Sequence, residues 1–413
     1  MRFLRAFLLA VVAGVLILCV QSTEGQISFN QSLFCKVNLG SPIESSPAGG
    51  SWPVFHHDQS HSGLADGMPD SVYIGTNDLS LFAINMQTCS IAWKFGTGGA
   101  VKSSPVVSVD SSGAVQDIYV GSDDGKLYAV KPDGKEDWQF APTLSDGNAS
   151  PGAIRSAPTI MPLGADNGVL FSSDDTHVYL LLNKQQLHIF PVDTSSESIP
   201  RIYTGSMRGS PIFDSDHTQV YVSSFNQTFH ALGSTDLVRN WDFPLNAPSS
   251  SSPALGEDKT IYLVSDVGTL YSIRSDGAQQ WRLFLNGDVT GSPSISSSGI
   301  IYLGTESGVM FGVKPNGTIL CSFQTLGPDG RANSGDESFG GIRSTPAIAN
   351  GFVYFGANDG TLYVIEENTC KLRTSFITKG PIVSSPMITV QDGRTRVLFG
   401  SEDGYFYALS LNL

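Results

Sequence analysis

The amino-acid sequence predicts an all-β protein, an eight-bladed β-propeller built from four-stranded antiparallel blades. Three repeated phrases carry this prediction: a β-hairpin phrase that recurs eight times, a short Pro-containing phrase ahead of it, and an aromatic phrase behind it. The composition agrees, because the 413 residues include 44 Gly and 22 Pro and only 15% are charged. Such a composition excludes helical bundles and coiled coils.

The hairpin phrase alternates apolar and polar residues around a turn rich in Asp and Gly, which is typical of a tight β-hairpin. Its copies span residues 72–84, 118–130, 220–232, 261–273, 301–313, 353–365 and 397–409, with a divergent copy at 169–181. The acidic turns, such as Asp124-Gly125, lack the spaced oxygen ligands of a calcium loop. We therefore expect these residues to form turns and not metal sites.

A short strand precedes each of seven hairpins and opens with small residues and a proline, as in Ser103-Ser104-Pro105. Small residues suit strands that crowd around a common axis. The fourth strand carries tryptophan in several repeats, and all five tryptophans occur in one type of phrase. We expect them to be structural anchors between neighbouring blades: Trp52, Trp93, Trp138, Trp241 and Trp281.

The eighth hairpin ends at Leu409, so its blade has no outer strand of its own. We expect Trp52–Phe55 to supply it and to close the ring with an N-terminal strand. Residues 26–50 are then an extension outside the repeat, and residues 51–413 form one propeller domain. The segment 62–70 lacks alternating β-branched residues, which predicts a short and weak inner strand for the first blade.

The N-terminus predicts a signal peptide over residues 1–25, because Arg2 and Arg5 precede an apolar run that ends at Val20. No second apolar stretch of about 20 residues follows, so we expect an exported chain without a membrane span. Four cysteines would remain, an even number that suits an oxidising compartment. One or two disulfides are expected, and three pairings stay open among Cys35, Cys89, Cys321 and Cys370.

The charge balance limits the classes of partner. The chain has 24 Lys and Arg against 38 Asp and Glu, a net charge of −14. Nucleic acids and anionic membranes are therefore excluded as expected partners.

Several phrases resemble the repeat of the pyrroloquinoline-quinone-like (quinoprotein) β-propellers over roughly residues 52–413. These are A-x9-W, found at Ala83–Trp93 and Ala231–Trp241, the S-x-P strand, and the VYxG…LYAL hairpin. WPVFHHDQSHSG, residues 52–63, resembles a phrase that precedes the first blade in secreted members. The resemblance implies the propeller fold, which hosts many functions.

For the enzymes of this family, the resemblance implies a quinone stacked between an indole and a vicinal disulfide, with calcium and a catalytic Asp. The chain has no adjacent cysteine pair, and every tryptophan is assigned to an outer strand. We therefore expect no cofactor, no metal and no catalytic residue. A pyrroloquinoline-quinone- and calcium-dependent oxidoreductase, or another enzyme on the same propeller, is the alternative.

Four residues of the N-terminal phrase resemble metal ligands: His56, His57, Asp58 and His61. Because the phrase lies where the ring closes, we expect His and Asp to pin the chain there by hydrogen bonds. A metal site is the alternative.

The candidate binding residues stand three positions before the prolines of the inner strands. Four of these seven positions are basic: Lys102, Arg155, Arg208 and Arg343. The start of an inner strand faces the mouth of the channel, so these side chains are expected to form a positive funnel for carboxylates or phosphates. The alternative is that each pairs with a loop carboxylate such as Asp146, Asp329, Asp336 or Glu337.

The sequence thus predicts a secreted, monomeric, non-catalytic binding or scaffold propeller. Its expected partner is a protein or a small anionic ligand at the channel mouth. The family includes scaffolds of bacterial outer-membrane assembly, which supports a role of this kind.

Overall fold

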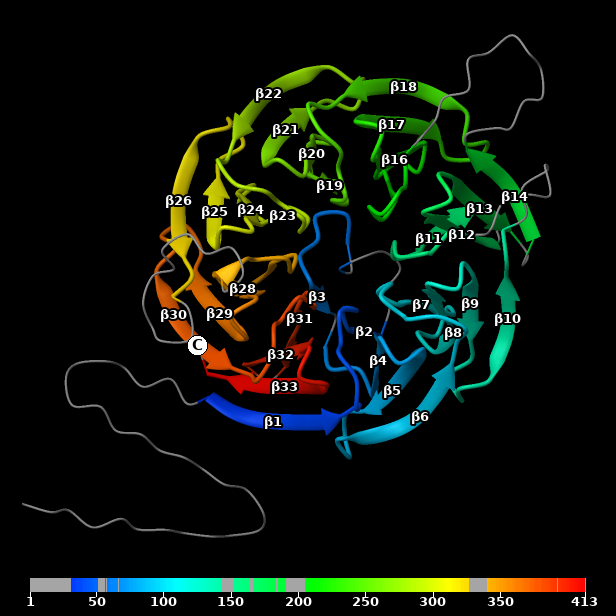
Figure 1. Cartoon of the computed structure of the whole chain (residues 1–413), viewed down its shortest axis with the longest axis vertical. Coiled ribbons are helices and arrows are strands. Elements are labelled where there is room, and N and C mark those ends of the chain that lie inside the picture. Colours follow the sequence, from blue (N-terminus) through cyan, green and yellow to red (C-terminus); the bar gives the residue numbers. More distant parts are fainter. Residues whose placement is uncertain are drawn as a thin grey trace, which may run out of the picture.

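A computed structural model describes residues 31–50, 56, 58–65, 67–142, 152–163, 166–182, 185–190, 205–326, 340–391 and 393–412. Eight separate sheets stand in a ring around a central axis, and the chain passes through them in order (Figure 1). Seven sheets have four strands, and the eighth has a fifth strand at its inner edge. The predicted eight-bladed propeller is therefore confirmed.

The strands of the first four blades run outward from the axis. Blade 1 has β2 (Ala48–Gly49), β4 (Ser71–Thr76), β5 (Ser80–Asn85) and β6 (Ser90–Gly96). Blade 2 has β7 (Val106–Val109), β8 (Val115–Gly121), β9 (Leu127–Val130) and β10 (Glu136–Phe140). Blade 3 has β11 (Thr159–Leu163), β12 (Asp166–Ser172), β13 (Val178–Leu182) and β14 (Gln185–Phe190). Blade 4 has β15 (Ile212–Phe213), β16 (Gln219–Ser224), β17 (Thr228–Gly233) and β18 (Arg239–Pro244).

The remaining blades follow the same order. Blade 5 has β19 (Ala254–Leu255), β20 (Ile261–Val264), β21 (Thr269–Ile273) and β22 (Gln279–Phe284). Blade 6 has β23 (Ser294–Ile295), β24 (Ile301–Gly304), β25 (Val309–Val313) and β26 (Ile319–Gln324). Blade 7 has β27 (Ala347–Ala349), β28 (Phe352–Gly356), β29 (Thr361–Glu366) and β30 (Leu372–Ile377). Blade 8 has β31 (Met387–Gln391), β32 (Arg394–Gly400), β33 (Tyr405–Leu411) and β1 (Gln31–Asn38), and β3 (Leu64–Ala65) adds to β31.

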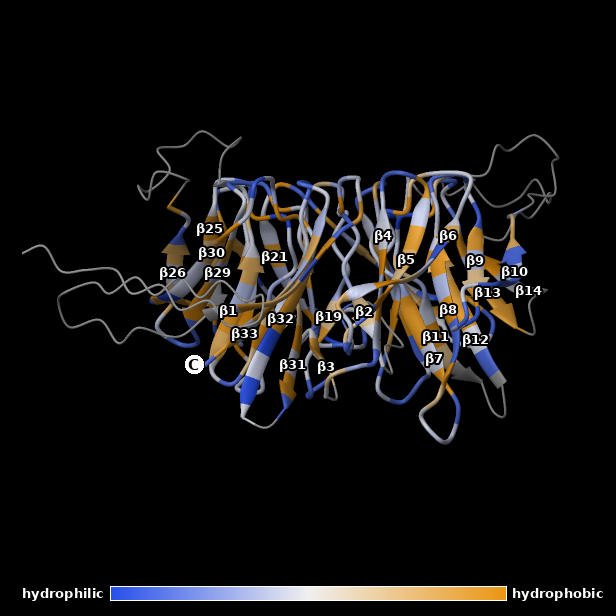
Figure 2. Cartoon of the chain, turned by 90° about the horizontal axis from the view of Figure 1, so that it is seen from below, coloured by the Kyte–Doolittle hydropathy of each residue, from blue (hydrophilic) through white to orange (hydrophobic). Residues whose placement is uncertain are grey.

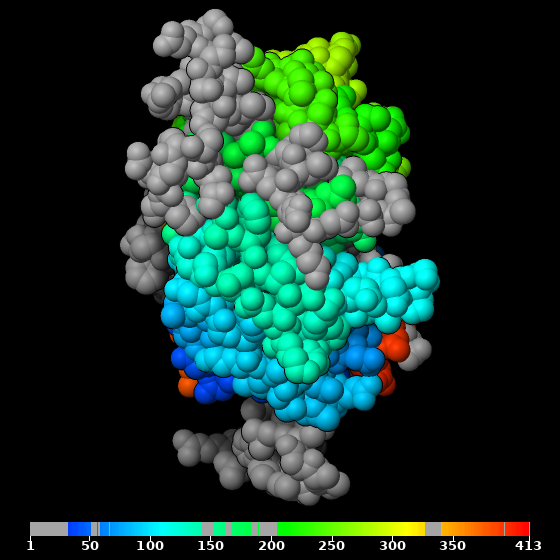
Figure 3. All heavy atoms as spheres, turned by 90° about the vertical axis from the view of Figure 1, so that its right-hand side faces the viewer, coloured from blue at the N-terminus to red at the C-terminus, as the bar shows by residue number. Residues whose placement is uncertain are grey.

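The core lies between the blades, where the second and third strands of each sheet pack on their neighbours. Figure 2 shows hydrophobic residues along the strands, and Figure 3 shows the outer wall formed by the blades at the right of Figure 1. The glycine that ends several second strands is required by this packing. A Cβ on Gly356 would lie 2.2 Å from Ile382 Cγ2, and one on Gly304 would lie 2.3 Å from Ile342 Cγ2. Each isoleucine lies in the segment that leads into the inner strand of the next blade. Any larger residue would push neighbouring blades apart.

The strand that closes the ring is β1, and not Trp52–Phe55 as the sequence analysis expected. β1 pairs antiparallel with β33 as the outer strand of blade 8. Residues 31–38 and 48–49 are therefore parts of blades, and not an extension outside the repeat. Trp52–Phe55 lies outside the described residues.

The prediction for the inner strand of blade 1 was also wrong. This strand is β2, which precedes Trp52, and not the segment 62–70 that follows it. Ser45-Ser46-Pro47 opens it as Ser103-Ser104-Pro105 opens that of blade 2, and β2 pairs with β4. The segment 62–70 instead contributes β3, a short parallel addition to blade 8. The phrase at residues 45–47 is the sequence signal for the true strand, and the sequence analysis overlooked it.

A ring of hydrogen bonds ties the inner strands together at the axis. In this hydroxyl ring, the backbone N–H of the residue before each proline donates to the side-chain hydroxyl of its equivalent in the next blade, at 2.9 to 3.2 Å. The ring residues are Ser46, Ser104, Ala157, Ser210, Ser252, Ser292, Thr345 and Ser385. One step is missing, from Ser104 to Ala157, because alanine has no hydroxyl.

Tryptophans contact the next blade at the turn between its third and fourth strands. The indole Nε1 atoms of Trp93, Trp241 and Trp281 donate to the carbonyl oxygens of Pro132, Ser275 and Pro315. This is the contact expected of an anchor between blades. Trp138 lies in the outer strand of blade 2, with its ring 5.8 Å from that of Tyr119.

Two disulfides take the place of this tryptophan contact. Cys35 in β1 and Cys321 in β26 occupy the register position that tryptophan has in other outer strands. Each is bonded to a cysteine in the equivalent turn of the next blade, in the pairs Cys35–Cys89 and Cys321–Cys370. The first bond joins blade 8 to blade 1 where the ring closes. Two disulfides are typical of exported proteins.

Candidate functional site

A segment of the N-terminal phrase lies inside the ring, against the inner strands. We call His56 and residues 58–65 the plug; Figure 1 shows this blue segment inside the ring. The backbone N–H groups of blades 5 to 8 hold it, each from the residue two positions after the inner-strand proline. Leu255, Ile295, Ile348 and Ile388 donate to the carbonyl oxygens of Gln59, Ser60, Ser62 and Gly63 at 2.7, 2.8, 2.8 and 2.7 Å. The plug is thereby bonded to four successive inner strands.

The polar side chains of the plug pin it in place. His61 Nδ1 lies 2.9 Å from the Pro293 carbonyl oxygen, and the ring nitrogens of His56 face the carbonyls of His61 and Pro386. Asp58 accepts hydrogen bonds from Ser60 and Ser62. Complete burial lowers the pKa of His61 to about 4. These contacts are the pinning role expected for the phrase, while His57 lies outside the described residues.

The predicted basic residues lie ahead of the inner strands, on the face of the ring where hairpin turns join the second and third strands. We call this the charged mouth. Each of the four is paired with a carboxylate: Lys102 Nζ with Glu44 at 3.1 Å, Arg155 Nε with Asp123 at 2.8 Å, Arg208 Nε with Asp174 at 3.1 Å, and Arg343 Nε with Glu306 at 3.0 Å. Arg155 also reaches Asp174 at 3.5 Å, which links two adjacent hairpins.

These carboxylates belong mainly to hairpin turns, and not to the long loops that the sequence analysis named. Asp123, Asp174 and Glu306 lie in the turns between second and third strands. Glu44 stands three positions before Pro47, so it is the blade 1 equivalent of Lys102. The loop acids Asp146, Asp329, Asp336 and Glu337 lie outside the described residues. Whether the four basic residues bind an anion stays a prediction.

Other carboxylates at the charged mouth make no ion pair within the described part of the chain. Asp266 accepts from the N–H and hydroxyl of Ser250, at 2.7 and 2.8 Å, and its pKa is raised by burial, with nearby Asp288 also contributing. The pKa of Glu402 is raised by burial and by Glu44. These acids make no ion pair of their own because the equivalent basic positions hold Ser250, Thr290 and Val383. Arg208 lowers the pKa of Asp266, and Arg343 and Lys102 lower that of Glu402, but burial outweighs both effects. The described part of the charged mouth thus has an excess of carboxylates.

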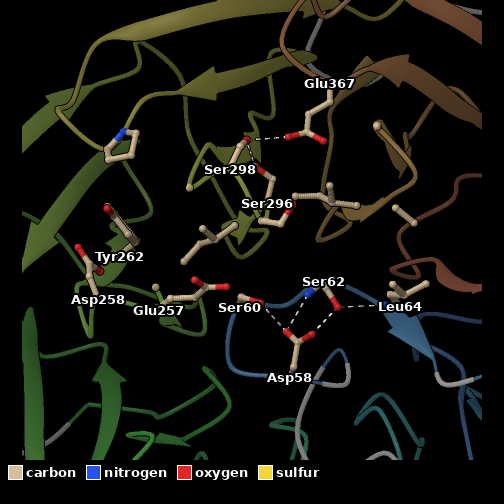
Figure 4. A pocket seen from close by; sticks show the side chains of 18 of the residues that line it. Asp58, Ser60, Ser62, Leu64, Glu257, Asp258, Tyr262, Ser296, Ser298 and Glu367 are labelled. Carbon is tan, nitrogen blue, oxygen red and sulfur yellow. Dashed lines mark hydrogen bonds between the residues drawn. The ribbon is translucent and has the colours of Figure 1, made fainter.

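The opposite ends of the inner strands surround a pocket of about 580 Å³ beside the plug (Figure 4). Asp58, Ser60 and Ser62 of the plug form one side, and the strand ends of blades 5 to 7 form the rest. Its acidic side chains are Asp58, Glu257, Asp258 and Glu367. Ser298 donates to Glu367 at 2.9 Å. Sequence reasoning missed this pocket because its lining comes from the plug and three separate blades, which are far apart in sequence.

The described residues do not fit the quinone and calcium that the fold family implies. The indoles of Trp93, Trp241 and Trp281 pack on neighbouring blades at the outer wall, away from the axis. Neither disulfide joins adjacent cysteines, since the two bonds span 54 and 49 residues. Among the residues that the structure describes, no group of three or more His, Cys, Asp or Glu is placed to hold a metal ion. The expectation that the protein binds no cofactor stays a prediction.

Within the described ranges, no helix is long and apolar enough to cross a membrane. The predicted signal peptide lies outside those ranges.

The sequence matches a known protein family over most of its length. A family model described as outer membrane protein assembly factor BamB matches residues 50–240 and 215–412. No curated protein matches the sequence.

Solved structures with this fold include BamB from Moraxella catarrhalis, with 14% identity, a TM-score of 0.62, and coverage of 92% of this chain and 99% of that one. Quinohemoprotein alcohol dehydrogenase from Comamonas testosteroni has 14% identity, a TM-score of 0.69, and coverage of 92% and 76%. The computationally designed Ika8 protein has 14% identity, a TM-score of 0.57, and coverage of 89% and 99%. At this identity, the structural likeness shows the fold alone.

Proposed function

Because the chain belongs to the family described as outer membrane protein assembly factor BamB, we propose that it is an exported, non-catalytic scaffold that binds a protein partner at the charged mouth. The arrangement of charge there is the observation that carries this proposal. Side chains on the inner strands and hairpin turns of a rigid ring can present a fixed pattern of charge to a partner.

The basic side chains at the mouth are accessible, and Asp266 and Glu402 are partly exposed. The basic side chains are exposed by 32% at Lys102, 34% at Arg155, 42% at Arg208 and 55% at Arg343, so their ion pairs can be exchanged for contacts with a partner. The carboxylates of Asp266, Asp288 and Glu402 make no ion pair within the described residues, so they favour a partner surface that presents Lys or Arg. The plug supports surface binding as well, because it lies inside the ring.

A small anion is the second candidate ligand. Arg343 contacts Glu306 through Nε, and Arg208 contacts Asp174 through Nε. Within the described residues, their Nη groups make no hydrogen bond, so each guanidinium retains donors for a carboxylate or phosphate. The alternative enzyme function, quinone-dependent oxidation, requires turnover with an artificial electron acceptor after addition of the quinone and calcium.

Calorimetric titration with two probes tests the proposal, with tetralysine as the cation and tripolyphosphate as the anion, each at low and high salt. We expect tetralysine to bind at low salt and Asp266→Asn with Glu402→Gln to weaken it about 3- to 10-fold. Arg274→Ala is the matched control, because Arg274 pairs with Asp276 in a turn of blade 5. Tetralysine affinity unchanged in the double variant would contradict the proposal.

The anion candidate makes a different prediction for the same titrations. Tripolyphosphate binding that is lost in the Arg155→Ala, Arg343→Ala double variant would support it and would place the ligand on the predicted basic residues. Turnover with the quinone and calcium would overturn the non-catalytic assignment.

A further inference from the structure

His56 makes two contacts that a neutral histidine cannot satisfy. The side chain is buried, and its Nδ1 and Nε2 atoms lie 2.8 Å from the carbonyl oxygens of His61 and Pro386. A carbonyl oxygen can only accept a hydrogen bond, and a neutral imidazole has one N–H. In either neutral tautomer, therefore, one ring nitrogen would point its lone pair at a carbonyl oxygen.

We propose that His56 is held as an imidazolium cation that clamps the plug to blade 8, so that loss of its second proton loosens the plug. With both nitrogens protonated, His56 donates to His61 within the plug and to Pro386 at the start of the last inner strand. Both hydrogen bonds are then charge-assisted, and such bonds are roughly twice as strong as neutral ones.

The surroundings of His56 fix the ring in this position. The backbone N–H of Gly63 donates to the His56 carbonyl at 3.1 Å, which folds the plug around the ring. A Cβ on Gly63 would lie 2.6 Å from His56 Nε2 and 2.7 Å from the Cβ of Ala347, and Gly63 has a φ of 66°. Glycine therefore lets the plug close over His56, and the ring has little freedom to turn away from the two carbonyls.

Among the residues that the structure describes, Asp58 and His61 of the plug are titratable groups close to His56. Asp58 is two residues along the chain, and His61 interacts electrostatically with both Asp58 and His56. Burial is the main cause of the low pKa of His61, and the positive charge of His56 lowers it further. The blade group that accepts from the His56 ring is the Pro386 carbonyl, which is uncharged.

The two histidines respond to pH in opposite directions. The folded protein favours the protonated form of His56, so the clamp stabilises the plug at lower pH and is lost as the pH rises. His61 donates through Nδ1 to Pro293 and stays neutral in the folded protein, so its contribution is lost as the pH falls. The plug is therefore held most firmly at intermediate pH.

Backbone amide exchange reports on the clamp directly. The N–H of Ile388 donates to Gly63 of the plug, whereas the N–H of Ile382 donates to Ala357 and makes no contact with the plug. Between pH 6 and pH 9, after correction for intrinsic exchange, we expect the protection of Ile388 to fall at least about 10-fold relative to Ile382. An unchanged ratio would overturn the proposal.

Two variants separate charge from packing. His56→Arg keeps a permanent cation with several donors, so Ile388 should stay protected at both pH values. His56→Gln is neutral and should give low protection at both. If His56→Gln matched the wild type throughout, the clamp would not exist.

If a variant fails to fold, the wild type still decides the matter. Selective ¹⁵N labelling of the seven histidines gives the protonation state of each ring. We expect both nitrogens of His56 to be protonated at pH 6 to 7. A ring with one unprotonated nitrogen in that range would overturn the proposal.

Discussion

Removing one disulfide or the other offers a matched comparison of how the ring is closed. Cys35–Cys89 and Cys321–Cys370 span 54 and 49 residues, so the chain-entropy model assigns both about 4 kcal/mol, with a difference of about 0.1 kcal/mol. Both also link an outer strand to the equivalent turn of the next blade. Any larger difference between variants that lack one or the other must therefore arise in the folded state.

The folded states differ in how the bonded strand is held. β26 is connected along the chain on both sides, to β25 before it and to blade 7 after it. Within the described residues, β1 is connected only through its C-terminal end. The apolar side chains that β1 buries are Cys35 and Val37, whereas Leu33 and Phe34 are 49% and 40% exposed. At the surface β1 makes cation–π contacts, such as Lys36 Nζ at 4.0 Å from the Tyr405 ring.

We therefore expect Cys35→Ser with Cys89→Ser to release β1 by local opening, and Cys321→Ser with Cys370→Ser to leave β26 in place. Urea unfolding should show similar losses of global stability in the two double variants. Amide exchange in β33, the partner of β1, should be at least about 10-fold faster in the first variant than in the second. Equal exchange in β33, or opening of β26 as readily as β1, would refute the reasoning.

Three further predictions concern the plug, the hydroxyl ring and the blade contacts. Burial lowers the pKa of His61 from 6.5 to about 4, so the unfolded chain binds this proton more readily than the folded protein does. The free energy of unfolding should therefore fall by up to about 3 kcal/mol as the pH falls from 6.5 to about 4. In urea unfolding, the difference in stability between the wild type and His61→Gln should shrink from pH 7 to pH 4.5. Ser292→Ala should lower the free energy of unfolding by about 1–3 kcal/mol, because it leaves the Ser252 N–H unpaired, and Ala157→Ser should raise it by about 0.5–1.5 kcal/mol by completing the ring. Melting temperatures that shift in the same direction in both variants would contradict this. Gly356→Ala should cost about 1–3 kcal/mol through its clash with Ile382, whereas Gly96→Ala, which meets open space, should change the urea midpoint little.

The repeat made the architecture predictable from sequence. Hairpin turns, small residues before proline and tryptophan phrases each act within one blade or between neighbours, so their spacing alone indicates eight similar units. The even cysteine count predicted disulfides but left three pairings open. Only the structure brings Cys35 beside Cys89, because this contact joins the two ends of the ring.

The candidate site was predictable only in part. The spacing of the inner strands located Lys102, Arg155, Arg208 and Arg343 at one mouth, since strand starts in a propeller share a face. Their carboxylate partners lie up to 58 residues away in sequence, which local patterns do not reveal.

The sequence by itself determined the propeller, its blade number and the positions of the basic residues, because these follow from short-range periodicity. Tertiary structure decided which N-terminal strand closes the ring, where the plug lies, and which charges remain unpaired at the mouth. Those features depend on contacts between segments that are distant in sequence. Small and polar residues occur in several segments of this chain, so composition alone does not show which segment makes each contact. The choice among them is made by the geometry of the closed ring.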